Sequence, residues 1–322
     1  MKAKALIVGA SGYNAMNLAR RLASGGHMVR GLVRDRARAV PGLDDVVTGD
    51  VVTGAGLGRA LDNIDVAFYF VHALDAADST DELDVRAAHE FVRAATAAKL
   101  PRGVFFTMLA PPPGTESPRY QRNRLHVEQI LMDGLPGMSA VRAGMVLGPG
   151  SRGPLPYLRL VQRSPILPLG PWRTNRIAVV DAATATECTY RAGTREDFAG
   201  RSVDAPASAQ PTHEEFVRGL IEILGLGRRR MIIPTPFADD RLDARLIATL
   251  TGQSYNFCRY LLSGNRLDYL IDPARAALFH DLTPASLHEG LQAVATAPAA
   301  SFRNISSFQR TSLPAPIQDH ER

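Results

Sequence analysis

The first twenty residues constrain the fold more than any other part of the chain. An apolar, β-rich run from Lys4 to Val8 leads into the glycine turn between Gly9 and Gly12, and a segment with helical periodicity follows from Ala15. A helix that begins directly after such a turn presents its free backbone N–H groups to one point, and these groups favour an anion there. The segment therefore predicts a strand–turn–helix unit of an α/β fold with a dinucleotide pyrophosphate as the anion.

The strand–helix alternation continues up to residue 145. Strands are expected at 5–8, 29–33, 45–48, 66–71, 103–107 and 139–142, and helices at 15–23, 57–61, 82–98 and 119–132. Short apolar strands that alternate with amphipathic helices are typical of a doubly wound parallel sheet. Residues 1–145 are therefore predicted to form a Rossmann domain.

The pattern is looser beyond residue 145. The segments 148–154 and 164–171 are predicted as loops, 177–180 and 231–233 as strands, and 212–224 and 241–262 as helices. We expect residues 146–302 to form a smaller, discontinuous substrate-binding lobe, interleaved with the Rossmann core and placed over the carboxyl edge of its sheet, where ligands bind in such folds. Residues 303–322 are predicted to be a flexible tail.

Composition narrows the classes of protein. No apolar run reaches about 18 residues, so no membrane partner is expected. The chain enters a strand at once and has two cysteines, Cys188 and Cys258, which predicts reduced thiols and a cytoplasmic protein. No histidine or cysteine cluster has metal-binding spacing.

The net charge is +5, yet only three of the 37 basic residues are lysines, which is typical of GC-rich coding as in actinomycetes. Nucleic-acid binding is therefore not expected, and the Arg228–Arg230 run is interpreted as solvated or as an anion contact.

The glycine turn defines the first part of the candidate cofactor site. Glycine at 9 and 12 lets the backbone turn tightly and approach a phosphate, and alanine at 15 permits close packing of the helix. The expected cofactor contacts in this segment are Gly9, Ser11, Gly12, Tyr13, Asn14 and Ala15.

The ends of the next strands supply the remaining cofactor contacts. Arg34 would face the 2′-phosphate of NADP(H), with Arg36 or Arg38 as a second clamp, because guanidinium groups bind phosphate bidentately. Asp35 keeps NAD(H) as an alternative, since a carboxylate at this position binds the ribose hydroxyl. Asp50 and Val51 are expected to flank the adenine, and Val71 and His72 the nicotinamide ribose.

Several stretches resemble one known family. GASGYNA, LVRD, TGDV, FYFVHAL, RAAHEFVRAA, GVFFTMLAPP, SPRYQRNRLHVEQIL, VRAGMVLGPGS, RIAVVDAA and IDPARAALF are similar to the atypical or extended short-chain dehydrogenase/reductases, in particular the NmrA-like NAD(P)H-binding group. The resemblance spans most of residues 1–295. It implies a Rossmann fold that binds a nicotinamide dinucleotide.

The resemblance also implies a catalytic tyrosine, a lysine four residues later and a serine near the end of the fifth strand. The matching residues here are Tyr120, Arg124 and Thr107. A cation beside the tyrosine would lower its pKa, although an arginine cannot relay a proton as a lysine can. The alternative is that Tyr120 packs at a helix start and Arg124 lies on the surface. His72, and less so His126, are the other acid–base candidates.

The substrate side is predicted from loops after residue 145. Met145, Tyr157, Trp172 and Arg173, with neighbouring leucines, would form an apolar wall with one cation over the nicotinamide. An aromatic or polyketide-like, partly anionic molecule would fit this wall. The alternative is that Tyr157 and Trp172 close the core of the small lobe.

The leading hypothesis is an NADP(H)-dependent oxidoreductase that reduces a small carbonyl or enone in actinomycete secondary metabolism. Two alternatives stay open. The first is a non-redox cyclisation, coupling or elimination with a structural or recycled cofactor, and the second is an NADP(H)-sensing regulator. The expected partner is an apolar or aromatic small molecule, and the chain is expected to be a monomer or homodimer.

Overall fold

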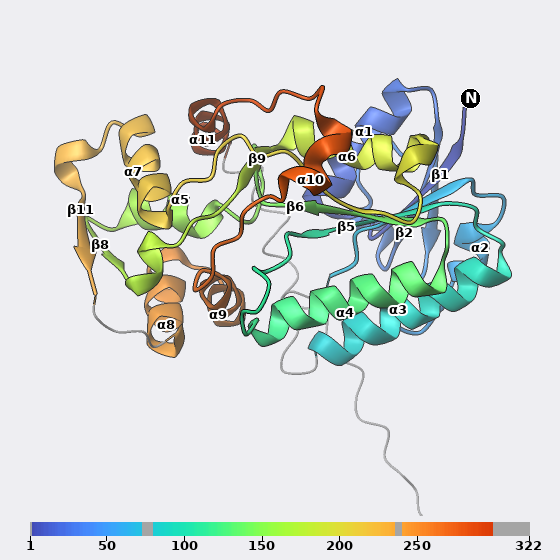
Figure 1. The fold of residues 1–322 in the computed structure, drawn as a ribbon, viewed down its shortest axis with the longest axis horizontal. Helices are drawn as coiled ribbons and strands as arrows, with labels where there is room; N and C mark the ends of the chain where they lie inside the picture. Colours follow the sequence, from blue (N-terminus) through green and yellow to red (C-terminus); the bar gives the residue numbers. More distant parts are fainter. Residues whose placement is uncertain (1, 73–79, 236–239, 299–322) are drawn as a thin grey trace, which may run out of the picture.

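A parallel sheet with helices on both faces forms the larger part of the molecule (Figure 1). The computed structural model describes residues 2–72, 80–235 and 240–298. The strands are β1 (Lys4–Val8), β2 (Met28–Val33), β3 (Asp45–Thr48), β4 (Val66–Tyr69), β5 (Gly103–Met108), β6 (Met138–Ala143) and β10 (Ser202–Asp204). Their order is β10-β6-β5-β4-β1-β2-β3, and every pair is parallel. The predicted doubly wound Rossmann sheet is confirmed.

Successive side chains of each strand point to opposite faces of the sheet, and helices cover both faces. In β1, Ala5 and Ile7 pack on α1 (Tyr13–Ser24) and α6 (Ala182–Thr194), whereas Leu6 and Val8 pack on the other face. That face is covered by α2 (Leu57–Leu61), α3 (Thr80–Ala97) and α4 (Arg119–Gly134). A strand buried on both faces reads as a continuous apolar run, which is why these strands were predictable.

The strand order reverses between β1 and β4, which places the topological switch point at their carboxyl ends. Gly9 follows β1 with a φ of +87°, and a Cβ there would lie 3.3 Å from the carbonyl carbon of Phe70, which follows β4. The two chain segments thus approach closely at this edge, and glycine meets both the steric and the conformational requirement.

The small lobe lies beside the sheet and has its own core (Figure 1). Its strands pair as β7 (Met145–Leu147) with β9 (Val179–Asp181) and β8 (Ile166–Leu169) with β11 (Met231–Pro234). Its helices are α5 (Leu155–Arg163), α7 (His213–Ile223), α8 (Asp240–Thr251), α9 (Tyr255–Gly264) and α11 (Leu287–Ala295), and the short α10 (Pro273–Ala276) lies near β10. The described helices include none that is long and apolar enough to cross a bilayer.

Several elements of this half differ from the sequence prediction. Strand β8 lies in a segment predicted as loop, and the helix predicted at 241–262 is two helices, α8 and α9, because Gly252 has a φ of +67°. Helix α5 follows Pro154 and carries Pro156 in its first turn, a position where proline costs no hydrogen bond. The tail predicted at 303–322 lies outside the described residues.

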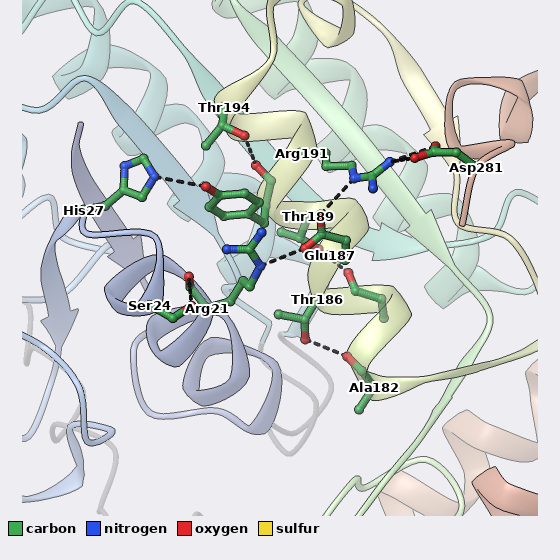
Figure 2. A network of polar contacts seen from close by, with 12 residues as sticks. Arg21, Ser24, His27, Ala182, Thr186, Glu187, Thr189, Arg191, Thr194 and Asp281 are labelled. Carbon is green, nitrogen blue, oxygen red and sulfur yellow. Dashed lines mark hydrogen bonds and ion pairs between the residues drawn. The ribbon is translucent and has the colours of Figure 1, made fainter. Parts of the chain in front are cut away.

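The chain after residue 145 returns to the Rossmann sheet. Helix α6 packs against α1, where Arg21 Nε lies 2.8 Å from Glu187 Oε2 and His27 Nε2 lies 3.2 Å from the Tyr190 hydroxyl (Figure 2). Glu187 also accepts a hydrogen bond from Arg191 at 2.8 Å. The segment 182–204 thereby supplies a covering helix and the edge strand β10 to the sheet.

A buried ion pair joins β10 to the rest of the sheet. Glu128 of α4 accepts bonds from Arg142 Nη2 at 2.7 Å and Nε at 3.1 Å. The Ser202 hydroxyl donates to the same carboxylate at 2.6 Å. One carboxylate therefore ties together α4, β6 and β10.

Candidate functional site

The turn between β1 and α1 leaves room for a ligand. Gly12 is the N-cap of α1, no side chain caps this helix, and no acidic residue lies in its first turn. A Cβ built on Gly12 would meet no atom within 4 Å. Ala15 is buried against the sheet, whereas Ser11 is exposed. Uncapped N–H groups beside open space suit an anion such as a pyrophosphate.

The segment after β2 is ordered by its own side chains. The Asp35 carboxylate accepts a hydrogen bond from the Ala37 N–H at 2.9 Å and caps the short 3-10 helix Arg36–Arg38. Arg36 Nη1 donates to the Val46 carbonyl at 2.8 Å, and Arg34 is exposed at the end of β2. Asp35 Oδ1 is therefore engaged by the backbone, and its neighbour Arg34 is exposed where a ribose is expected.

The other predicted cofactor contacts lie along the same edge. Asp50 Oδ1 accepts from the Val52 N–H at 2.8 Å, and Val51 is buried in the core beneath it. The Val71 carbonyl accepts a hydrogen bond from Arg124 Nη1 at 3.3 Å. The backbone after β4 is thereby linked directly to helix α4.

Three of the four predicted catalytic residues meet in one polar cluster. The Tyr120 hydroxyl is hydrogen-bonded to His72 Nε2, and His72 Nδ1 lies 3.3 Å from Asp84 Oδ2. Arg124 Nη1 lies 3.7 Å from the same carboxylate oxygen, and its side chain is 4% exposed against 2% for Asp84. Arg124 is thus a buried cation and does not lie on the surface. The helical i, i+4 spacing brings Tyr120 and Arg124 to the same face of α4.

The environment sets the protonation states of this cluster. Burial, helped by the positive charge of Arg124, lowers the pKa of His72 to about 4, so the ring is neutral near pH 7. A carboxylate beside Nδ1 favours the tautomer that carries its proton there, which leaves Nε2 to accept from the Tyr120 O–H. Burial also raises the pKa of Tyr120, and this outweighs the lowering by Arg124. Tyr120 is therefore a protonated phenol, a donor and not a base.

Two members of the cluster were not predicted from the sequence. Asp84 lies on the buried stripe of α3 with Ala87, Ala88 and Phe91, and a carboxylate on such a stripe is the signal that could have identified it. Tyr260 of α9 packs edge-on against Tyr120, with ring centroids 3.6 Å apart. No local pattern around Tyr260 indicates this contact.

The remaining acid–base candidates lie apart from this cluster. Thr107 is 7% exposed near the carboxyl end of β5, opposite Arg142 in the register with β6. It shares the sheet edge with the cluster, but the contacts of Tyr120 described above do not include it. His126 is exposed on another face of α4.

The predicted substrate residues are packed inside the small lobe. The Tyr157 hydroxyl lies 3.0 Å from His213 Nδ1 and accepts from Asn265 Nδ2 at 2.7 Å. Trp172 packs edge-on against the same histidine, and Met145 belongs to the same core. Arg173 Nε lies 3.3 Å from Glu214 Oε2. These contacts correspond to the alternative left open by the sequence, in which the aromatic residues close the lobe core.

A cavity of about 390 Å³ lies between the start of α4 and the end of α9. Its lining includes Arg119 and Arg122, which flank Tyr120 along the chain, together with Ser263 and Arg266. A second cavity of about 720 Å³ lies among α1, α6 and α11, away from the Tyr120 cluster. The smaller cavity is lined by sequence neighbours of Tyr120, although Tyr120 is not among its lining residues.

Comparisons with known proteins agree with the resemblance and the fold. Residues 1–121 match the model of the NmrA-like family, which confirms the predicted resemblance over that part. The chain is 29% identical over 243 residues to a ceramide reductase of Caulobacter vibrioides, covering 71% of this chain and 73% of that protein.

Two solved structures show the same fold at low identity. The Bordetella bronchiseptica enzyme WbmH in complex with NAD+ has a TM-score of 0.68 at 18% identity, over 94% of this chain and 99% of that one. The Thermus thermophilus UDP-glucose 4-epimerase complex with NAD has a TM-score of 0.68 at 14% identity, over 93% and 99% of the two chains. At these identities the likeness establishes the fold alone.

Proposed function

We propose that this NmrA-like chain is an NADP(H)-dependent oxidoreductase that reduces the carbonyl group of an apolar molecule. The proposal rests on the polar contacts that lead from Tyr120 through His72 to Asp84 at the carboxyl edge of the sheet. Arg124 is buried beside these contacts. The reductase name of the Caulobacter relative supports the reduction, and the NAD complexes of the two structural neighbours support a nicotinamide dinucleotide as cofactor.

The residues at the sheet edge fit a nicotinamide dinucleotide. Gly9 and Gly12 allow the close approach of a pyrophosphate, and the uncapped start of α1 offers it N–H donors. Arg34, exposed at the end of β2, is the candidate ligand of a 2′-phosphate, and Arg36, which donates to the Val46 carbonyl, lies two residues further on. Asp35 caps the Arg36–Arg38 turn through Oδ1, and the preference for NADP(H) over NAD(H) is proposed from the exposed guanidinium of Arg34 beside it.

When bound, the dinucleotide supplies a hydride to the carbonyl carbon. The protein then has to supply a proton to the carbonyl oxygen, and Tyr120 is the buried group that holds one at neutral pH. Arg124 stabilises the phenolate that remains, since its guanidinium stays charged in the same cluster. His72 accepts from the Tyr120 hydroxyl through Nε2 and so positions it, and the phenolate takes its new proton from water.

The test is the oxidation of NADPH in the presence of long-chain aliphatic ketones. Tyr120→Phe is expected to lower kcat by roughly 10²–10⁴-fold, the usual contribution of a positioned acid, while NADPH binding stays within about twofold. Tyr255→Phe, a tyrosine of α9 outside the cluster, is the matched control and should keep full activity. Full activity of Tyr120→Phe, or failure of the wild-type protein to bind NADPH, would refute the proposal.

Cofactor preference is tested separately. Arg34→Ala should weaken NADPH binding by about 10–100-fold and leave NADH binding unchanged, because only NADPH carries the phosphate that a guanidinium would bind. Equal losses for both cofactors would argue against Arg34 as the phosphate ligand.

The same assays separate the alternatives. Product formed without net NADPH oxidation would identify a non-redox reaction, and NADPH binding without any turnover would identify a sensing regulator. The cytoplasmic location and a place in secondary metabolism stay predictions from the sequence.

A further inference from the structure

Aliphatic side chains that are ordinarily buried are exposed at one end of the small lobe. Within the described ranges six large hydrophobic side chains are exposed, and five of them come from β8, β11 and α8. These five, called the aliphatic face below, are Ile166, Met231, Ile233, Leu242 and Leu246. Met231 is 58% and Leu242 55% exposed. Single exposed hydrophobic residues are common on protein surfaces, but a group of them marks an interaction site.

The β8–β11 pair supplies the first part of this face. Ile166 lies opposite Met231 in the parallel register, and Leu167 and Leu169, which alternate with the outward residues, are fully buried in the lobe core. The pair therefore has one inner and one outer apolar side. The outer side carries Ile166, Met231 and Ile233.

Helix α8 adjoins the end of this strand pair (Figure 1). A Cβ on Gly170, the residue after β8, would lie 3.0 Å from Asp243 Oδ2 of α8. Leu242 and Leu246 are one helical turn apart and both exposed, so α8 adds a second apolar strip at this end of the lobe.

Positive charge borders the aliphatic face. Residues 226–251 contain five arginines and three aspartates, a net charge of +2. Arg228 and Arg229 are exposed directly before β11, and Arg241 and Arg245 are exposed beside Leu242 and Leu246 on α8. Exposed aliphatic residues with neighbouring cations are typical of proteins that attach to a lipid surface.

We propose that the aliphatic face and its arginines bind the surface of an anionic lipid bilayer. The aliphatic residues would enter the headgroup region while the guanidinium groups bind lipid phosphates. The sequence prediction of no membrane partner rested on the absence of a spanning segment, and attachment to a surface needs none. The proposal is independent of the reaction proposed above.

A second copy of the chain fits this face less well. A symmetric dimer places the same patch against itself, so two positively charged patches would be brought together. A protein partner is also disfavoured, since binding hot spots are rich in tryptophan and tyrosine, and the aliphatic face has no aromatic residue.

The experiment is co-sedimentation of the whole protein with vesicles of phosphatidylcholine alone or of equal parts phosphatidylcholine and phosphatidylglycerol. Binding is expected only to the anionic vesicles and should weaken with salt. The double variant R228A/R229A should bind about 30-fold less, since each cation near such a surface contributes about 1 kcal/mol. Met231→Gln should bind about tenfold less through lost apolar burial.

The matched controls are Met28→Gln, the exposed methionine outside the aliphatic face, and Arg86→Ala, an exposed arginine of α3. Both should bind like the wild type, and all variants should keep their thermal midpoint and NADPH affinity. The proposal fails if the wild type stays in the supernatant with anionic vesicles, or if Met231→Gln and Met28→Gln bind equally. It also fails if light scattering shows a wild-type dimer that Met231→Gln dissociates while lipid binding is unchanged.

Discussion

Replacing Asp84 with asparagine removes the negative charge at the centre of the buried polar cluster. Arg124 would keep its bond to the Val71 carbonyl and its position over the Phe105 ring, but would lose the carboxylate 3.7 Å away. Breaking a buried ion pair from one side costs about 3–5 kcal/mol, and the separation here favours the lower end, about 3 kcal/mol. With an unfolding entropy of about 2.1 cal/mol/K per residue, that loss lowers the thermal midpoint by about 4–5 °C.

The same change should act on turnover. Without the carboxylate at Nδ1, nothing selects the tautomer in which His72 Nε2 accepts from Tyr120. We therefore expect Asp84→Asn to lower kcat for NADPH-dependent ketone reduction by about 10²-fold, with KM changed by less than about threefold, because the residue acts through His72 and does not bind the substrate.

Thermal unfolding by circular dichroism and initial rates on the same preparations measure both effects. Glu90→Gln is the control, since it breaks the pair with Arg93, whose side chain is 69% exposed. Exposed pairs contribute about 0–1 kcal/mol, so this variant should be close to wild type. If Asp84→Asn is as stable and as active as Glu90→Gln, the reasoning about the buried cluster is wrong.

Three further predictions concern stability and cofactor binding. Glu128→Gln should lower the free energy of unfolding by about 3–5 kcal/mol in urea titration, because Arg142 then stays buried without its carboxylate partner. Burial lowers the pKa of His213 to about 3, so the unfolded chain takes up a proton below about 6.5 that the folded protein does not. Stability should therefore fall by about 2 kcal/mol between pH 7.5 and 5 from this group, and His213→Gln should flatten that part of the pH profile of the thermal midpoint. Gly9→Ala should destabilise by about 1–2 kcal/mol through its positive φ, and calorimetry should show weaker NADPH binding than in Gly58→Ala, whose site is open.

The central sheet was predictable because its strands are buried on both faces and its helices have wide apolar stripes. Strand β3 has the predicted bounds, and β1, β2, β5 and β6 differ from theirs by one residue at one or both ends. Helix α6 was missed because alanine and threonine dominate it, so no large apolar residues mark its buried face. Strand β10 has three residues and depends on its pairing with β6, which no local pattern contains.

The candidate site was predictable to the extent that it is local. Tyr120 and Arg124 are four residues apart on one helix, and His72 follows a buried strand. Asp84 reaches them only because α3 packs along α4, and Tyr260 comes from a helix 140 residues further along the chain. Such contacts depend on tertiary packing, so periodicity and spacing do not reveal them.

Strand β10 pairs with β6 at the edge of the sheet, but the ribosome makes several elements of the small lobe between these two strands. Strand β6, buried along its whole length, has no partner on one side until residue 204 has left the ribosome. By then β7, α5 and β8 of the small lobe have already been made. A nascent chain at this stage exposes an apolar strand edge, the kind of surface that chaperones protect. A polypeptide cut at residue 145 keeps that edge open permanently, so we expect it to aggregate and not to fold as an independent domain.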